Sequence, residues 1–333
     1  MICLGIESTC DETSIAVVNS NFEILSNVIY SQIPLHSKFG GVFPELAARE
    51  HVEKISSCYE EALAIAGIKP EEIDLIAVAY GPGLIGSIQI GLTFAKTLSL
   101  LLGVPFVAVN HVHAHLIAPL LDHKEAFPLF PAIGMVLSGG HTQINYMQDP
   151  LHVETIGSTI DDAIGECFDK CGKLCNLPYP GGPHVERLAL KGDRSQVSLK
   201  SCRVKEKPLS FSYSGLKTQV LYALKDPKVR HEDLLASFQH TVFTDLVKKA
   251  RKAVAMTGAK AIFMGGGVAS SQTLRKYFLE LECPVFFPSK DLSLDNGAMI
   301  GGLGLLQMQA YGPSAHDIEP KTRILFPTPS ILL

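Results

Sequence analysis

Three histidines stand within five residues, His111, His113 and His115, in the stretch NHVHAHL. On an α-helix of 3.6 residues per turn, His111 and His115 share one face and His113 points elsewhere. Two imidazoles at this spacing can bind one divalent metal when other residues supply the remaining ligands. The spacing alone does not separate a metal site from histidines that merely decorate a helix.

A zinc-protease site is disfavoured because Val112 follows His111, where the HExxH signature has the glutamate that acts as general base. Asp295, in LSLDNGAMIGGLGLL, is the candidate third ligand. It stands at the predicted N-cap of a Gly-rich helix, and capping alone is the common reason for an aspartate there. Both interpretations of Asp295 stay open at this point.

The elements that must position these residues alternate along the chain. Asn110 is a good N-cap, and a helix is predicted from His111 until Pro119. The first half predicts strands at 1–6, 13–18, 73–80 and 104–109, with helices over 49–67 and from the GPGLIGS turn to residue 103. Such alternation favours mainly parallel sheets in an α/β protein.

The second half of the chain repeats this pattern of strands, glycine-rich turns and helices. Strands are predicted at 131–137 and 142–147 around an SGGH turn, then a strand at 259–264, a GGG turn and a helix over 268–280. The echo predicts a duplicated fold with a central cleft. The predicted lobes are residues 1–110 with about 300–333, and residues 111–299.

Three glycine-rich turns follow predicted strands, where backbone N–H groups can approach a phosphate without a Cβ in the way. They contain Gly81, Gly83 and Gly86, then Gly139 and Gly140, then Gly265 to Gly267. None is a P-loop, and no GxGxxG follows the first strand. Turn geometry is the alternative for each turn, but three in one chain favour a phosphate-bearing ligand.

Composition predicts a soluble protein with an ample core, since 47% of the 333 residues are hydrophobic and 19% are charged. The N-terminal segment has no basic flank and the apolar runs are short, so we expect neither a secretory signal nor a membrane span. Eight cysteines without a signal favour free thiols and a cytoplasmic location. Cys167, Cys171 and Cys175 share a helical stripe without CxxC pairs, and we interpret them as core residues.

The net charge is −4, yet residues 186–230 hold 11 Lys or Arg against 4 acidic residues. This basic stretch is a candidate surface for a phosphate backbone. An ordinary solvated surface is the alternative.

Ten motifs together resemble the TsaD/Gcp/Kae1 family of tRNA adenosine threonylcarbamoyltransferases, once described as glycoprotein endopeptidases. The likeness runs from residue 2 to about residue 302. The motifs are GIESTCDETS, GGVFPELAAREH, GPGLIGS, HVHAH, LSGGHTQ, GSTIDDAIGECFDK, YPGGP, FSYSGLKT, MGGGVASSQTLR and DNGAMIG.

The resemblance implies an actin-like ATPase/sugar-kinase fold of two duplicated lobes. It implies transfer of a threonylcarbamoyl group from threonylcarbamoyl-AMP to the exocyclic amine of the adenosine 3′ of the anticodon, in tRNAs reading ANN codons. One divalent metal, iron or zinc, would be held by His111, His115 and Asp295. The adenylate would contact Val136, Leu137, Ser138, Gly139, Gly140, Asp169, Gly182 and Glu186.

Asp11 and Glu12 would face the cleft, and we hypothesise that Asp11 helps deprotonate the attacking amine. The chain departs from the family where His113 replaces a glutamate and where Ser271 replaces an asparagine that contacts the nucleotide. The order of Ser and Thr in GIESTC is also swapped. The adenylate affinity is the property that Ser271 puts in doubt.

Expected partners are tRNA, a TsaB-like paralogue and a TsaE-like small ATPase, with the adenylate made by a separate synthase. A homodimer stays open, and residues 186–230 are the candidate tRNA surface. The competing hypotheses are a non-catalytic actin-like nucleotide-binding module and a metallopeptidase. A kinase rests on fold analogy alone.

Overall fold

The structure is a computed structural model that describes residues 1–327, so the last six residues of the predicted first lobe lie outside it. The chain divides into two compact units. The first contains Met1–Pro128 and Pro288–Leu325, and the second contains Leu129–Phe287 with Phe326 and Pro327. The predicted boundaries at 110/111 and near 300 were therefore misplaced, because helix α4 (His111–Asp122) packs on α11 (Gly297–Tyr311) inside the first unit.

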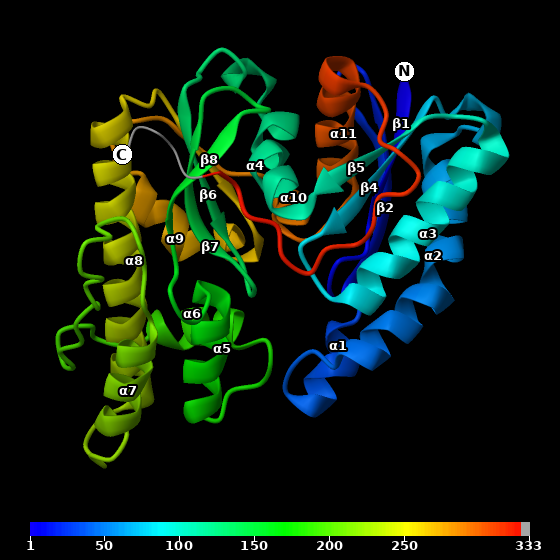
Figure 1. Cartoon of the computed structure of the whole chain (residues 1–333). Helices are drawn as coiled ribbons and strands as arrows, with labels where there is room; N and C mark the ends of the chain where they lie inside the picture. Colours follow the sequence, from blue (N-terminus) through cyan, green and yellow to red (C-terminus); the bar gives the residue numbers. More distant parts are fainter. Residues whose placement is uncertain (328–333) are drawn as a thin grey trace. The chain divides into compact units, whose positions relative to one another are not determined.

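The first unit is built on a mixed five-stranded sheet of order β3-β2-β1-β4-β5. Strands β1 to β3 pair antiparallel, and β1, β4 and β5 run parallel. Helices α2 and α3 pack on one face, and α4 and α11 on the other (Figure 1). The strands are β1 (Ile2–Glu7), β2 (Glu12–Asn19), β3 (Ile24–Ser31), β4 (Leu75–Gly81) and β5 (Phe106–Asn110). The other helical segments are α1 (Ile33–His36), η1 (Ser37–Phe39), α2 (Pro44–Ala66), η2 (Pro70–Glu72), α3 (Ile85–Leu102), η3 (Lys124–Ala126) and α10 (Lys290–Ser293).

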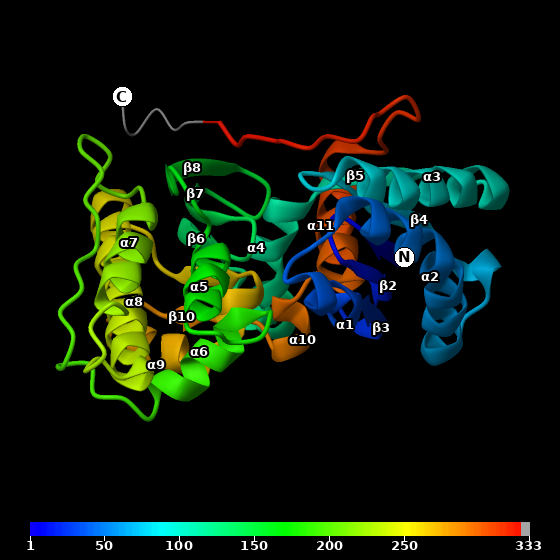
Figure 2. The ribbon, with the colours of Figure 1, turned by 90° about the horizontal axis from the view of Figure 1, so that it is seen from below.

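The second unit repeats this plan with the strand order β10-β9-β6-β7-β8. A three-stranded antiparallel meander again stands beside two strands that run parallel to its first strand, which confirms the predicted duplication. Helices α6 and α7 lie against the long α8 (Figure 2). The strands are β6 (Ala132–Leu137), β7 (Thr142–Met147), β8 (Val153–Ser158), β9 (Ile262–Gly265) and β10 (Val285–Phe286). The helical segments are α5 (Ile164–Leu174), α6 (Gly181–Ala189), α7 (Ser214–Ala223), α8 (His231–Thr257), η4 (Gly267–Ser270) and α9 (Gln272–Phe278).

Each unit has its own apolar core, as the alternation of buried strands and amphipathic helices predicts. In the second unit the Phe168 ring lies 4.9 Å from Phe238 and 5.7 Å from Phe243, between ring centroids. Cys167 and Cys171 are fully buried in the same core, which confirms that the cysteine stripe belongs to it. All eight cysteines, which lie within residues 1–327, are free thiols.

Two helix boundaries differ from the sequence prediction. Helix α4 continues through Pro119 to Asp122, since a proline removes one hydrogen bond without ending a well-packed helix. The helix predicted over 268–280 is instead a 3₁₀ turn, η4, followed by α9, because the Ser271 hydroxyl caps the N–H of Leu274 and starts a new helix.

Helix α3 departs from the expectation of short apolar runs. Among the described residues it alone has the length and apolar composition of a membrane-crossing helix. Core helices of compact domains have the same composition, and α3 packs on β4 and α2 through buried residues such as Ile88 and Leu92.

Helix α11 crosses β1 at a backbone-to-backbone contact. A Cβ added at Gly5 would lie 2.0 Å from the Gly297 carbonyl oxygen and 2.6 Å from the Gly301 nitrogen. No side chain fits between these backbones, so glycine on both elements is what permits the helix to pack this closely on the strand.

We predict that Gly5→Ala lowers the free energy of unfolding by about 3 kcal/mol, because the added methyl must push α11 away from β1. Urea unfolding followed by circular dichroism measures the change. Gly41→Ala is the control, because its Cβ would meet nothing within 4 Å, and we expect a change within about 0.5 kcal/mol. Equal stability of Gly5→Ala and the wild type would contradict this account of the packing.

Candidate metal centre and nucleotide-contacting residues

The histidine pair is set by the start of α4. The side chain of Asn110 accepts hydrogen bonds from the N–H groups of Val112 and His113, so the helix begins at His111 as predicted. His111 and His115 then lie one turn apart, with ring centroids 4.7 Å apart and edge-on. Both rings are buried, at 5% and 0% exposure, so they are not solvent-exposed surface residues of the helix.

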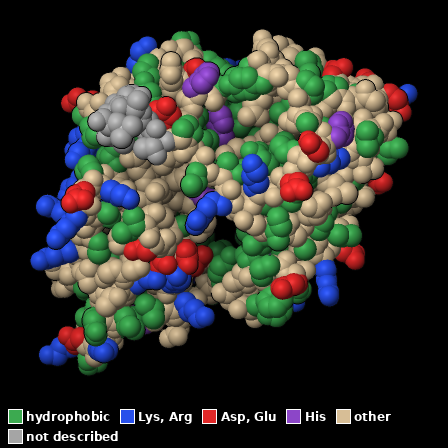
Figure 3. Space-filling view, in the orientation of Figure 1, with side chains coloured by type: hydrophobic (Ala, Val, Ile, Leu, Met, Phe, Trp, Pro, Cys, Tyr) green, Lys and Arg blue, Asp and Glu red, His purple; other side chains and the backbone are tan. Residues whose placement is uncertain are grey.

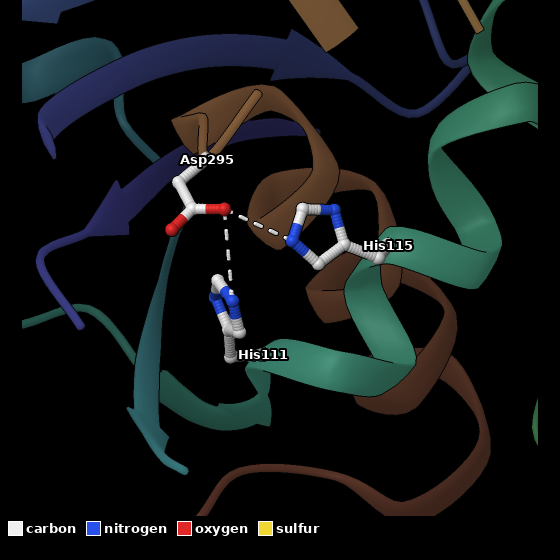
Figure 4. A group of neighbouring side chains, drawn as sticks. All are labelled: His111, His115 and Asp295. Atoms are coloured by element: carbon white, nitrogen blue, oxygen red, sulfur yellow. Dashed lines mark hydrogen bonds and ion pairs between the residues drawn. The ribbon is translucent and has the colours of Figure 1, made fainter. Parts of the chain in front are cut away.

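Asp295 meets both imidazoles. Its Oδ1 lies 3.0 Å from Nε2 of His115 and 3.7 Å from Nε2 of His111 (Figure 4). Ligands about 2.1 Å from a tetrahedral metal are roughly 3.4 Å apart, which falls between these two distances. Two imidazole nitrogens and a carboxylate oxygen, all within 4.8 Å of one another, can therefore hold a divalent ion. This donor set suits both zinc and iron.

Asp295 is not the helix cap that the sequence left open. The residue after it, Asn296, is the N-cap of α11, and its side chain accepts a hydrogen bond from the N–H of Met299 at 2.9 Å. The Asp295 carboxylate is therefore spared for the histidines. His113 is buried on α4 outside this group of three.

Glu7 is a site residue that the sequence analysis missed. It ends β1, is fully buried, and its Oε2 lies 2.8 Å from Nδ1 of His111. The Thr9 hydroxyl lies 3.1 Å from the same nitrogen, and the Thr9 N–H donates to Glu7 Oε1 at 2.6 Å. A carboxylate on Nδ1 keeps the proton there and leaves Nε2 facing Asp295. The available signal was an acidic residue closing an apolar strand, a costly position without a partner.

Burial and the neighbouring charges have opposite effects on the pKa of His111. Burial alone would lower the pKa of His111, but the carboxylates of Glu7 and Asp295 outweigh it and raise this pKa to about 9. Without a metal, the two carboxylates thus favour the protonated, positively charged form of His111. At the other histidine, the buried Nδ1 of His115 has no hydrogen-bond partner within residues 1–327.

Asp11 and Glu12 lie in the same unit, where the chain enters β2. Glu12 is buried, and the Ser31 hydroxyl donates to its Oε1 at 3.1 Å. Burial, then the nearby carboxylates of Asp11 and Asp295, raise the pKa of Glu12 well above its usual range. Asp11 is half-buried, so of the two acids it is the more accessible.

The second unit gathers the residues expected to contact the adenylate. Val136 and Leu137 end β6 as buried residues, and Ser138 opens the turn to β7, where its Oγ accepts a hydrogen bond from the His141 N–H at 3.0 Å. Helix α5 begins against this turn, since Gly165 N–H donates to the Ser138 carbonyl at 3.1 Å.

Two acidic residues of this unit accept hydrogen bonds from the first residues of neighbouring helices: Asp169 from the start of α6 and Glu186 from the start of α9. Asp169 on α5 accepts a hydrogen bond from the Gly181 N–H at 2.7 Å, next to Gly182 at the start of α6. Glu186 on α6 accepts from the Ser271 hydroxyl at 2.9 Å and from the Thr273 N–H at 2.7 Å. Ser271 therefore has a structural role as cap and tether of α9.

The glycines of the three glycine-rich turns differ in what surrounds them. In the first, a Cβ at Gly81 would lie 2.0 Å from the Lys321 carbonyl oxygen, and one at Gly83 would lie 2.3 Å from the Thr9 carbonyl oxygen. Packing thus accounts for the glycines of that turn. In the second turn, by contrast, a Cβ at Gly139 or Gly140 would meet nothing within 4 Å. The third turn is mixed: Gly267 is equally open, but Gly266 has a φ of +88° and a Cβ there would lie 2.5 Å from the Leu137 carbonyl oxygen.

Comparison with solved structures defines the fold class. HypF from T. kodakarensis superposes with a TM-score of 0.63 at 16% identity over 93% of this chain, which spans about half (48%) of that protein. Component A of (R)-2-hydroxyglutaryl-CoA dehydratase from Acidaminococcus fermentans gives 0.55 at 12% identity, covering 93% and 99% of the two chains. The chain has the actin-like ATPase fold, with two mixed sheets flanked by helices, as predicted.

Sequence comparison is more specific. The family model TsaD, described as tRNA N6-adenosine threonylcarbamoyltransferase, matches residues 23–302. Proteins of that name from Protochlamydia amoebophila and Clostridium perfringens are 48% and 43% identical, over 97% of this chain and 98% and 97% of theirs. The chain belongs to the TsaD family, which confirms the resemblance in its motifs.

We predict that Glu7→Gln weakens binding of Zn²⁺ about 10- to 100-fold, because His111 loses the carboxylate that orients it. Competition with a chromogenic chelator measures the affinity without any turnover. Glu23→Gln serves as the control, since Glu23 is an exposed residue that bonds only to the nearby Asn19 turn. An unchanged affinity in Glu7→Gln would mean that the Glu7–His111 contact has no part in metal binding.

Proposed function

We propose that this chain transfers the threonylcarbamoyl group from threonylcarbamoyl-AMP to the exocyclic amine of the adenosine 3′ of the anticodon, in tRNAs that read ANN codons. The observation that carries the proposal is the buried arrangement of His111, His115 and Asp295 in a chain that belongs to the TsaD family. The enzyme is thus an acyltransferase that modifies tRNA.

The reaction is an acyl substitution. The amine nitrogen attacks the carbamoyl carbonyl carbon, the bond from this carbon to the phosphate oxygen breaks, AMP leaves, and the amine gives up one proton. Because AMP is already a good leaving group, the protein has mainly to position the reactants and stabilise charge. A divalent metal, zinc or iron, would orient the threonylcarbamoyl group and polarise its carbonyl.

The residues of the chain have separate tasks in this proposal. His111, His115 and Asp295 hold the metal, and Glu7 keeps the His111 ring turned so that Nε2 faces Asp295. Asp11 accepts the proton of the attacking amine. Glu12, whose pKa is raised by burial and by neighbouring acids, is suited to stay protonated and donate a hydrogen bond.

The adenylate is assigned to the second unit. Its proposed contacts are Val136 to Gly140, Asp169, Gly182, Glu186 and Ser271. The open space at Gly139, Gly140 and Gly182 supports this, because neither protein packing nor a left-handed φ calls for glycine there. Backbone N–H groups at such positions can approach a phosphate closely.

We further propose a cytoplasmic enzyme that works with a TsaB-like paralogue and a TsaE-like ATPase. The support is the family membership. A non-catalytic nucleotide-binding module and a metallopeptidase are both disfavoured, since the named relatives are transferases and Val112 occupies the position of a protease glutamate.

The first test is single-turnover transfer of labelled threonylcarbamoyl from its adenylate to an ANN-decoding tRNA transcript, with and without the bacterial partners. We expect label on the tRNA with the wild type and at least a roughly 100-fold lower rate with His111→Ala. His123→Ala is a matched histidine control, because His123 lies beyond α4 next to Glu125. Tight adenylate binding without transfer, even with the partners, would favour the nucleotide-binding module.

Asp11→Asn tests the proton acceptor. We expect the single-turnover rate to fall about 100-fold, within the usual range for a general base, while the adenylate dissociation constant stays unchanged. Rates are measured by quenched flow and adenylate binding by calorimetry. An unaltered rate with intact binding would exclude Asp11 from proton transfer.

A further inference from the structure

We propose that a basic pocket between α8 and α9 of the second unit binds backbone phosphates of tRNA. The pocket has a volume of about 420 Å³. Four cationic side chains line it together with two polar rings, and these define what we call the basic pocket: Arg194, Lys248, Arg251 and Lys276, with His240 and Tyr277. The choice of tRNA rests on the proposed function.

The four cations come from three separate segments that folding brings together. Lys248 and Arg251 are three residues apart on α8 and so share a face, Lys276 lies on α9, and Arg194 lies in the loop after α6. Lys and Arg side chains gather over the second unit on the side of α8 in the space-filling view (Figure 3).

The four cations differ in their pairing, among the residues that the structure describes, from other lysines of the second unit. Lys249, the residue after Lys248, pairs with Asp245, and Lys217 pairs with Asp162. Within residues 1–327 no ion pair is formed by Arg194, Lys248, Arg251 or Lys276, although Glu280 also borders the pocket. Four like charges held around one hollow repel each other, and a polyanion relieves that repulsion.

A polar network fixes the inner wall of the pocket. Nη1 of Arg194 lies 3.1 Å from Nδ1 of His240, and the Tyr277 hydroxyl lies 2.7 Å from the same nitrogen. Because a guanidinium can only donate, Nδ1 of His240 must accept, which leaves this ring neutral. Arg194 is thus held through Nη1, which also lies 3.4 Å from the Tyr277 hydroxyl, while within residues 1–327 its Nε and Nη2 groups make no hydrogen bond. Those two groups form the planar fork that suits a phosphate.

The composition of the lining favours a phosphate backbone over an apolar partner. Val247 is its one aliphatic side chain, and it is buried at 6% exposure. Half to two-thirds of the hydrogen bonds in protein–DNA complexes go to the backbone, chiefly from Arg, Lys and hydroxyl groups, and the basic pocket presents this set. Of the stretch 186–230, which the sequence analysis offered as a tRNA surface, Arg194 is the residue that lines the basic pocket.

The test compares two double variants of equal charge change. Lys248→Gln with Arg251→Gln removes two pocket cations, whereas Lys252→Gln with Lys260→Gln removes two exposed cations outside the pocket. Fluorescence anisotropy with an unmodified ANN-decoding tRNA, at several salt concentrations, gives the dissociation constant and its salt slope. The holo protein with its bacterial partners is used throughout.

We expect the pocket variant to bind tRNA roughly 10- to 30-fold more weakly at about 0.15 M salt, with the salt slope smaller by about 2, one for each phosphate that the variant no longer neutralises. The control variant should keep the wild-type dissociation constant within about twofold. Arg194→Gln, which changes a loop rather than a helix, should weaken binding in the same direction, so a folding defect in α8 cannot account for the result.

The outcomes separate this proposal from the proposed function. Wild-type transfer activity with unchanged tRNA binding in the pocket variant would overturn the basic pocket alone. Weaker tRNA binding in that variant, in a protein that transfers no label, would support the pocket and overturn the transferase. If the variant loses binding to poly-glutamate but keeps its affinity for tRNA, an acidic protein segment is the ligand and the proposal fails.

Discussion

The first unit depends on the contact between the backbones of α11 and β1. At Gly5 and Gly297 the helix lies so close to the strand that no Cβ could stand between their backbones. The Gly297 N–H also donates to the Ser14 hydroxyl on β2 at 2.8 Å, which ties the first turn of α11 to the sheet. Where this helix begins is therefore determined by the sheet, and so is the position of the residue just before its cap.

The geometry of the candidate metal centre follows from that constraint. Because Asn296 caps α11, Asp295 stands at the end of the preceding segment with its carboxylate beside α4. The other side of the centre is fixed from β1, whose last residue, Glu7, holds His111. Strand β1 thus positions Asp295, because α11 packs on it, and orients His111, because Glu7 is its last residue. A buried carboxylate that would be costly alone is compensated by the imidazole it orients.

The duplicated units use the same topological position in different ways. The turn after β1 packs against Gly83 and carries Thr9, whose hydroxyl lies 3.1 Å from Nδ1 of His111, and it leads through Asp11 into Glu12 at the start of β2. The corresponding turn after β6 carries Ser138, Gly139 and Gly140, and at both glycines there is open space where a side chain would be. The same strand–turn–strand plan therefore presents acidic residues in one unit and open backbone in the other.

The sequence by itself determined the α/β alternation, the duplication and the start of α4, because hydrophobic periodicity, turn residues and the Asn110 cap are local signals. Spacing alone also placed His111 and His115 on one face. The tertiary structure decided that Asp295 is a partner rather than a cap, that Glu7 belongs to the centre, and that the unit boundary falls after α4. It also assembled the basic pocket from three distant segments. The Glu7–His111 and His115–Asp295 contacts join residues 104 and 180 positions apart, and such contacts leave no periodic trace in the chain, since they depend on how helices pack on a sheet.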